Sequence, residues 1–329
     1  MRKFAVIVCL VMLAFGKDVQ IKFDLHRQVV STTLDGGRVL LGLQGGLLAN
    51  FELKTAAFSP PTQLCRSQEA SVLSLHSNAN ATAALCGRRD GEYEIVLLRG
   101  EKTRRFAVDE ASFSQLQLDA NSGFDPRVKA KTHAANARLL REVFVLDEAR
   151  VLLVTLGSEI YEFDTALEKV TAAFKFSNYG WQDADFEPQS GVFVLANESG
   201  VVFFYDVFEK KLLCQKSLHT DLIYQVAFKN GVFLSGSAQR NAKFSPHFNP
   251  KKSCEAEFRE FKSDFSVYAV GVSRDGEAAF STKNGLVWVS KNGVEKAEFS
   301  SSPTLFLDFY EGSLVAVTRG GGIFLWEAK

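Results

Sequence analysis

The stretch VFVLANESGVVFFYD, residues 192–206, decides the fold. Five apolar residues, Val192–Ala196, are followed by the turn sequence Asn197–Gly200, and a second, mostly apolar run ends in the pair Tyr205-Asp206. Short apolar runs separated by Asn, Ser and Gly are typical of antiparallel strands joined by tight turns. The stretch therefore predicts a β-hairpin whose second strand ends in an aromatic–acidic pair.

The same unit recurs along the chain. Clear copies occupy residues 151–164 and 313–327, and further copies of its first apolar run begin near residues 38, 81, 231 and 277. Five of the six spacings between the seven starts lie between 36 and 46 residues. A period of about 40–45 residues is that of a four-stranded propeller blade. The sequence therefore predicts an all-β fold, a single seven-bladed β-propeller over residues 17–329.

Two segments fall outside the repeat. The longest spacing contains an insertion at about residues 109–141, and the chain stops after the third strand of the last unit. Ahead of the first unit, Val19–Leu25 alternates apolar and polar residues, as a strand does. Because an unpaired strand edge promotes aggregation, we expect this N-terminal strand to pair with the last blade and close the ring.

Parts of the repeat resemble the WD40 repeat. Leu218–Phe228 resembles its opening, including His219, and Leu234–Phe244 resembles its continuation, although Gln239 replaces the usual turn Asp. The aromatic–acidic pairs that end third strands also match: Phe51-Glu52, Phe163-Asp164, Tyr205-Asp206 and Trp326-Glu327. Only one unit has the histidine, so the repeat is a diverged one. The resemblance implies that His219 ties the start of its blade by hydrogen bonds.

The chain also resembles a narrower family, the NapL accessory proteins of periplasmic nitrate reductase. The similarity is strongest over residues 160–164, 183–207 and 223–230. The resemblance implies a protein that is not an enzyme and that supports the expression, maturation or activity of the reductase by binding protein partners, among them components of the reductase. We expect a monomer with no catalytic, cofactor-binding or metal-binding residue.

Residues 1–16 have the pattern of a secretory signal peptide. Arg2 and Lys3 precede an unbroken apolar run, Phe4–Phe15, and Ala14 and Gly16 are the small residues expected before a cleavage site. The run is too short to span a bilayer as a helix. We therefore expect cleavage after Gly16 and export, to the periplasm in a bacterium, with no membrane segment in the mature protein. A buried first strand is the alternative.

Four cysteines follow the signal segment: Cys65, Cys86, Cys214 and Cys254. Their spacing contains no C-x-x-C pair, which argues against a zinc ribbon, thioredoxin-like redox chemistry and attached haem. Each lies in an apolar or strand-like run, so we expect buried free thiols. One disulfide is the alternative in an oxidising compartment.

The composition and the motifs exclude several classes of function. The chain has 38 basic and 38 acidic residues, whereas nucleic-acid binding leaves a basic excess. The histidines are far apart, and no metal, nucleotide or nucleophile motif appears. Asp183, Asp185 and Glu187 alternate along one strand and so share a side of it. A solvated strand face is the favoured interpretation, and an acidic pocket of a metal-dependent propeller hydrolase or lactonase is the alternative.

Two segments are candidates for partner binding. The insertion is basic, with Arg127, Lys129 and Lys131 among its residues, and a second loop holds Tyr179 and Trp181. Tyr and Trp are enriched at interface hot spots. Both segments join one blade to the next, so we expect them on the same face of the ring, where they would suit an acidic protein surface. The alternatives are a solvated loop for the insertion and packing between blades for Trp181.

Overall fold

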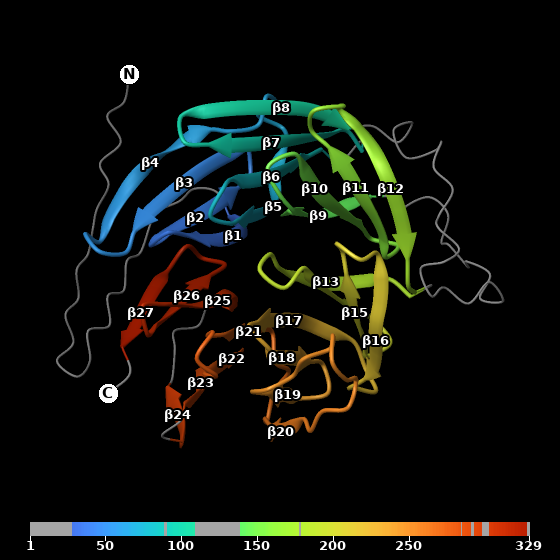
Figure 1. Cartoon of the computed structure of the whole chain (residues 1–329). Helices are drawn as coiled ribbons and strands as arrows, with labels where there is room; N and C mark the ends of the chain where they lie inside the picture. The colour runs from blue at the N-terminus through green and yellow to red at the C-terminus, as the bar shows by residue number, and fades with distance from the viewer. Residues whose placement is uncertain are drawn as a thin grey trace.

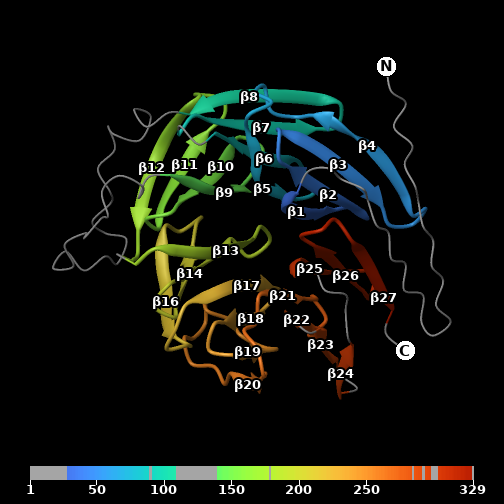
Figure 2. The same cartoon turned by 180° about the vertical axis from the view of Figure 1, so that it is seen from behind.

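The computed structural model describes residues 28–88, 91–108, 139–177, 179–283, 285–290, 293–297 and 303–327. This part of the chain forms 27 strands in seven antiparallel sheets, which are arranged in a ring (Figure 1, Figure 2). Cavities lined by residues of the first strands form a channel at the centre of the ring. The first strand of each sheet lies nearest the channel, and the later strands lie progressively further out. The predicted seven-bladed propeller is confirmed. No helix able to cross a membrane occurs in the described ranges.

The strands follow the chain in order, blade by blade. Blades 1 to 3 consist of β1 (Val29–Asp35), β2 (Arg38–Leu43), β3 (Leu47–Glu52), β4 (Ala57–Gln63), β5 (Ser71–Ser77), β6 (Thr82–Gly87), β7 (Tyr93–Arg99), β8 (Lys102–Val108), β9 (Leu140–Val145), β10 (Arg150–Thr155), β11 (Glu159–Asp164) and β12 (Lys169–Lys175).

Blades 4 to 7 continue the pattern, and blade 7 has three strands in the described residues. They consist of β13 (Trp181–Glu187), β14 (Val192–Asn197), β15 (Val201–Asp206), β16 (Lys211–Ser217), β17 (Ile223–Lys229), β18 (Val232–Ser237), β19 (Asn241–Ser245), β20 (Arg259–Lys262), β21 (Ala269–Val272), β22 (Ala278–Thr282), β23 (Gly285–Ser290), β24 (Gly293–Ala297), β25 (Thr304–Tyr310), β26 (Ser313–Thr318) and β27 (Ile323–Glu327).

The second strand of every blade begins at the predicted position or one residue from it. These strands are the most buried ones, because they lie between two neighbours of their own sheet and between two adjoining blades. The core is accordingly divided into seven clusters, each formed by residues of two adjoining blades. The fold is therefore held by face-to-face packing of sheets around the ring, driven by burial of apolar surface.

The aromatic–acidic pairs have a local structural role. The ring of Tyr205 is buried, and an oxygen of Asp206 accepts hydrogen bonds from the backbone N–H groups of Phe208 and Glu209, at 2.9 and 3.0 Å. Asp164 caps the equivalent turn of blade 3 in the same way. The acidic residue thus fixes the turn between the third and fourth strands, as Asp does in Asx turns.

Disulfide pairing differs from the expectation of free thiols. Cys65 pairs with Cys86, and Cys214 pairs with Cys254, with Cα–Cα distances of 5.8 and 5.6 Å. The first pair joins blades 1 and 2, and the second joins β16 of blade 4 to the long loop that follows β19 in blade 5. The four cysteines are buried or half-buried because they lie between blades. That position also brings two of them together between blades 1 and 2, and two between blades 4 and 5.

Several expectations fall outside the described residues. The signal segment, the N-terminal strand Val19–Leu25 and most of the insertion are among them, so ring closure stays a prediction. β9 begins at Leu140, and Arg141 is therefore part of this strand rather than of the insertion. β27 is the outermost described strand of blade 7, where the other six sheets have a fourth strand.

Candidate functional site

A ring of side chains surrounds one mouth of the channel because the innermost strands share a backbone irregularity. In six of the seven blades the register shifts near the start of the first strand, which leaves one residue unpaired. Such a β-bulge redirects a side chain. The unpaired residues are Val30, Leu73, Arg141, Gln182, Tyr224 and Leu305, and Tyr268 lies just before β21; all seven line the same cavity.

Beyond the bulges, side chains of one innermost strand bond to the backbone of the next. Ser74 Oγ and His76 Nδ1 in blade 2 accept hydrogen bonds from the N–H groups of Val143 and Val145, at 3.2 and 3.0 Å. Gln225 in blade 5 accepts one from Val270 in blade 6, at 2.9 Å. These innermost strands have a free edge toward the channel, and the side chains satisfy its buried donors.

The carboxylates predicted to share one strand face take part in the same pattern. Asp183 and Asp185 accept hydrogen bonds from the N–H groups of Val226 and Phe228, at 2.8 and 2.7 Å, and Glu187 accepts one from Asn230. The expectation of a solvated strand face is wrong, because this face lies against the first strand of blade 5. The three residues do share a side of β13, as the alternation predicted.

A second group of acidic side chains lies where blades 3 and 4 meet. The indole N–H of Trp181 donates to Glu142 Oε2 at 3.0 Å, and Glu142 is also hydrogen-bonded to Asp183. Burial, reinforced by the charge of Asp183, raises the pKa of Glu142 well above its usual range. Burial also raises the pKa of Asp183, against the effect of the Val226 N–H. Two negative charges are therefore disfavoured at this site, and the pair takes up a proton more readily than two exposed carboxyl groups would.

Five residues line both of the cavities along the channel, and we call the level at which they lie the waist: Thr33, His76, Asp185, Lys229 and Val272. Lys229 forms an ion pair with Asp308 of blade 7. Burial lowers the pKa of His76 to about 4 and raises that of Asp185 to about 6. His76 is therefore neutral at pH 7, and its ring packs edge-on against Phe144 at 5.1 Å between ring centroids.

The waist separates two chambers. The upper chamber, about 790 Å³, is lined by the starts of the innermost strands, and the lower chamber, about 710 Å³, is lined by their ends and by the turns that follow. We call the corresponding faces of the ring the upper and lower face. The upper face also holds the connections between blades and the turns between second and third strands, such as those with Lys283 and Arg319.

The residues predicted for partner binding lie in different settings. Tyr179 is on the upper face with 57% of its surface exposed, and Trp181 is the half-buried first residue of β13. Trp181 lines the upper chamber and packs against the core between blades 3 and 4. Its predicted position in a surface loop is therefore wrong. The alternative, packing between blades, is confirmed. Arg127, Lys129 and Lys131 lie outside the described residues.

The backbone around Tyr179 is held in place. Its N–H donates to Ser177 Oγ at 3.0 Å, and its carbonyl accepts from Ser158 Oγ at 2.8 Å. The next residue, Gly180, donates to a carboxylate oxygen of Glu198 at 3.1 Å. An exposed aromatic ring on a fixed backbone loses little entropy on binding, which is the property of an interface anchor.

Other functional candidates were missed by the sequence reasoning. Tyr224 and Tyr268 lie at the upper mouth with their ring centroids 5.1 Å apart, and Tyr268 is 39% exposed. Glu142, His76 and Lys229 line the channel from three different blades. Alignment of the first strands of the repeat would place Tyr224, Tyr268 and Glu142 near the upper mouth, and His76 and Lys229 further along the channel. The described residues contain no group of three or more His, Cys, Asp or Glu side chains placed to hold a metal ion.

His219 has the structural role that the WD40 resemblance implied. Its ring nitrogens bond to Asn241 Oδ1 at 2.9 Å and to Ser235 Oγ at 2.8 Å, and the side chain is buried. Ser237 Oγ donates to the same Asn241 oxygen, at 2.9 Å. The network ties the segment before β17 to β18 and β19, so the first strand of blade 5 is fixed to its own sheet.

These features define a seven-bladed β-propeller with a divided channel. No family model and no curated protein matches the sequence. Among solved structures, the chain is similar to the β-propeller domain of Cps50 (Swd1) from Myceliophteria thermophila, with a TM-score of 0.65, 10% identity, and coverage of 92% of this chain and 96% of that one. It is also similar to the computationally designed Ika8 protein, with a TM-score of 0.60, 11% identity and the same coverage. Identities this low show a shared fold and nothing more.

Proposed function

We propose that the protein is an exported, non-enzymatic propeller that binds a protein partner through its upper face and acts as an accessory factor of periplasmic nitrate reductase. The observation that carries the proposal is the arc of aromatic residues on the upper face, formed by Tyr224 and Tyr268, which line the mouth, and by the exposed Tyr179 on the connection into blade 4. Two of the four large apolar or aromatic side chains that are exposed in the described residues belong to this arc.

The charges at the upper mouth favour an acidic partner. Lys283 and Arg319 are exposed in turns at its rim, whereas the carboxyl groups of the upper chamber lie along the innermost strands, beside Arg141. Lys283 is held over the ring of Phe265, at 4.5 Å from the ring centre, so its charge stays at the surface. Cationic groups beside exposed aromatic rings suit an acidic protein surface.

The position of the channel carboxylates supports a non-enzymatic role. Both oxygens of Asp185 accept backbone hydrogen bonds, from Phe186 and Phe228, and Asp183 bonds to Val226 and to Glu142. Groups used in this way hold neighbouring blades together and have little capacity left for a substrate. The metal-dependent hydrolase considered at the level of sequence has no comparable support.

The cysteine pairs support export. Every cysteine beyond the proposed signal segment is in a pair, and the fifth, Cys9, lies within that segment. Structural disulfides form and persist in secreted and periplasmic proteins, and they are rare in the cytosol. The pairing thus agrees with the charged and apolar pattern of residues 1–16. The link to nitrate reductase rests on the NapL resemblance.

The proposal is tested by measuring binding of the purified reductase to the immobilised mature propeller at low and high salt. Tyr179→Ser should weaken binding by about tenfold or more, as removal of a hot spot does. Replacing Arg127, Lys129 and Lys131 with Ala should slow association at low salt, because electrostatic steering is screened. Leu167→Ser, at an exposed apolar residue of the lower face, is the matched control. Absence of binding by the wild-type propeller would overturn the reductase assignment, and equal binding by Tyr179→Ser would overturn the site.

A further inference from the structure

The lower mouth of the channel differs chemically from the upper one. Five carboxylates and two cationic side chains line the lower chamber: Asp147, Asp185, Glu187, Asp275 and Glu311 against Lys229 and Arg274. The lining of the upper chamber is balanced, with four side chains of each sign. Asp147 and Glu311 have cationic partners beyond the lining, Arg150 and Lys54, and Lys229 is paired with Asp308. Among the described lining residues, Asp185, Glu187 and Asp275 then face Arg274 alone, so the lower chamber is the acidic end of the channel and favours a positively charged group.

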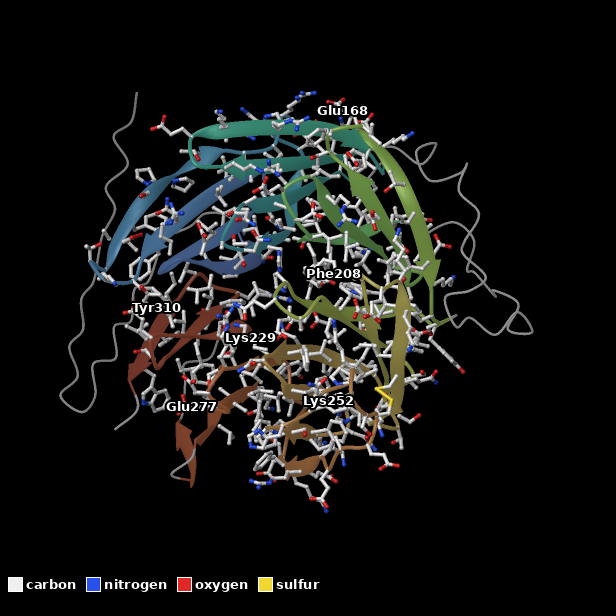
Figure 3. All side chains as sticks on the ribbon, in the orientation of Figure 1. Glu168, Phe208, Lys229, Lys252, Glu277 and Tyr310 are labelled. Atoms are coloured by element: carbon white, nitrogen blue, oxygen red, sulfur yellow. A yellow bond between two sulfur atoms is a disulfide. The ribbon has the colours of Figure 1, made fainter. Side chains whose placement is uncertain are left out.

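An exposed aromatic side chain stands beside this mouth. Phe208 is 50% exposed, and its ring covers Gly191, where a Cβ atom would collide with it. The turn that ends at Gly191 includes Pro188 and Gln189, which line the lower chamber. Val207 N–H donates to the Gly191 carbonyl at 3.0 Å and joins the two turns. Figure 3 labels Phe208 together with Lys229, which lies at the centre of the ring.

The turn that carries Phe208 is fixed by hydrogen bonds and an ion pair of the neighbouring residue. Asp206 fixes the turn through the Phe208 N–H, and its other oxygen forms an ion pair with Lys251 at 2.6 Å. At the rim, the side chain of Asp275 is exposed and forms no ion pair within the described residues. An apolar side chain on a fixed turn, next to a surplus of negative charge, suits a partner segment that carries an apolar and a basic side chain.

We propose that the lower chamber and Phe208 form a second docking site, which binds a segment of a partner protein that carries a Lys or Arg side chain and an apolar side chain close together. The basic side chain enters the acidic mouth, and the apolar one packs on the exposed face of Phe208. The acidic rim disfavours an anionic lipid surface, because like charges repel. With partners of opposite charge on its two faces, the propeller would join two proteins.

The test uses a display library of random peptides selected on the immobilised wild-type propeller. Enriched sequences should combine basic and apolar residues, and the affinity of a synthetic enriched peptide should fall by about tenfold or more with Phe208→Ser and with Asp275→Lys. Leu167→Ser is the matched control, since Leu167 is 59% exposed on the equivalent turn of blade 3, whereas Phe208 packs against the blade 4 turn whose Pro188 and Gln189 line the chamber. Binding to this control should equal that of the wild type.

Three outcomes would overturn the proposal: no enrichment of peptides that combine basic and apolar residues, equal loss of affinity in Leu167→Ser, or Phe208-dependent binding to vesicles of anionic phospholipid in place of the peptide. The result is separable from the upper-face proposal, because Tyr179→Ser should leave peptide binding unchanged. Phe208→Ser and Asp275→Lys change exposed side chains, and their melting curves should overlay that of the wild type, so that a change in affinity reports on the site itself.

Discussion

Lys229 of blade 5 and Asp308 of blade 7 form an ion pair that passes over the first strand of blade 6. The Asp308 carboxylate also accepts a hydrogen bond from its neighbour's N–H, at 2.7 Å. The pair braces two blades that are not adjacent in the ring, and its Lys229 belongs to the channel waist.

Removing one partner of this pair should cost more than removing both. Lys229→Met leaves the half-buried Asp308 carboxylate without a cation, and we expect a loss of about 1–3 kcal/mol in the free energy of unfolding. The double variant with Asp308→Asn should recover part of the loss. Urea denaturation of the two single variants and the double variant measures the coupling. Purely additive losses would show that the ion pair contributes nothing.

The contribution of His76 and His219 to stability should fall as the pH is lowered from about 6.5 to about 4. Burial lowers the pKa values of His76 and His219 from 6.5 to about 4, so in this range the unfolded chain binds protons that the folded protein does not. Each histidine contributes roughly 1.4 kcal/mol for every unit of pKa difference. Asp185, Glu142 and Asp183 act in the opposite sense, because a raised carboxyl pKa favours the folded state as the pH falls, through about 6 in the case of Asp185. The histidine contribution is therefore isolated by comparing variants.

The histidine contribution is tested by urea denaturation at several pH values. His76→Gln should reduce the slope of stability against pH between about 6.5 and about 4, because one of the two lowered pKa values is lost. His247→Gln is the control, since His247 is exposed and away from the channel. An unchanged slope in His76→Gln would contradict the assignment.

The hydrogen bond that Asp183 accepts from the Val226 N–H should be measurable as a difference in stability between two substitutions of Asp183. Asp183→Ala leaves the Val226 N–H without its acceptor, and we expect a loss of about 1–3 kcal/mol. Asp183→Asn keeps an acceptor oxygen and removes a charge next to Glu142, so it should cost less. Asp264→Ala, at an exposed site, should change stability by less than about 0.5 kcal/mol. Thermal unfolding in one buffer compares all three.

The disulfide between blades 1 and 2 should contribute to stability. Cys65 and Cys86 are separated by 21 residues, and closing a loop of this size stabilises a protein by about 3 kcal/mol in the chain-entropy model. We expect the double variant with Ser at both positions to melt at a lower temperature. A reducing agent should lower the melting temperature of the wild type but leave it unchanged in a variant that lacks all four cysteines.

Ring closure by the N-terminal strand remains a prediction with a direct test. Deleting Lys17–Leu25 from the mature protein should leave the edge of β27 unpaired if this strand completes blade 7. Aggregation or a clear drop in melting temperature is the expected result. A deletion variant that stays monomeric with the wild-type melting curve would contradict closure by this strand.

The sequence predicted the blades well because each second strand is buried on every side. A fully buried strand needs an unbroken apolar run, and such runs stand out at all seven positions. His219 was assigned correctly because its partners, Ser235 and Asn241, come from its own blade and lie within the same repeat.

The channel was harder to predict because its residues meet across blades. Alternation placed Asp183 and Asp185 on one side of a strand, but nothing in the local sequence indicates that the N–H groups of Val226 and Phe228 lie opposite. Trp181 was expected in a loop, since a bulge that begins a strand has no sequence signature of its own. The cysteine pairs were missed for a related reason, because spacing alone does not show which segments adjoin at a blade boundary.

The bonds between innermost strands have a direction. Ser31 bonds to Val72, His76 to Val145, Asp185 to Phe228 and Gln225 to Val270, and each of these bonds runs from one blade to the next in chain order. The blades therefore recognise their neighbours through residues far from the ends of the chain. A circular permutant opened at the exposed turn of Gly276, with its old ends joined, would retain each of these bonds and the order of the ring. The position at which the polypeptide starts is thus separate from the information that arranges the blades.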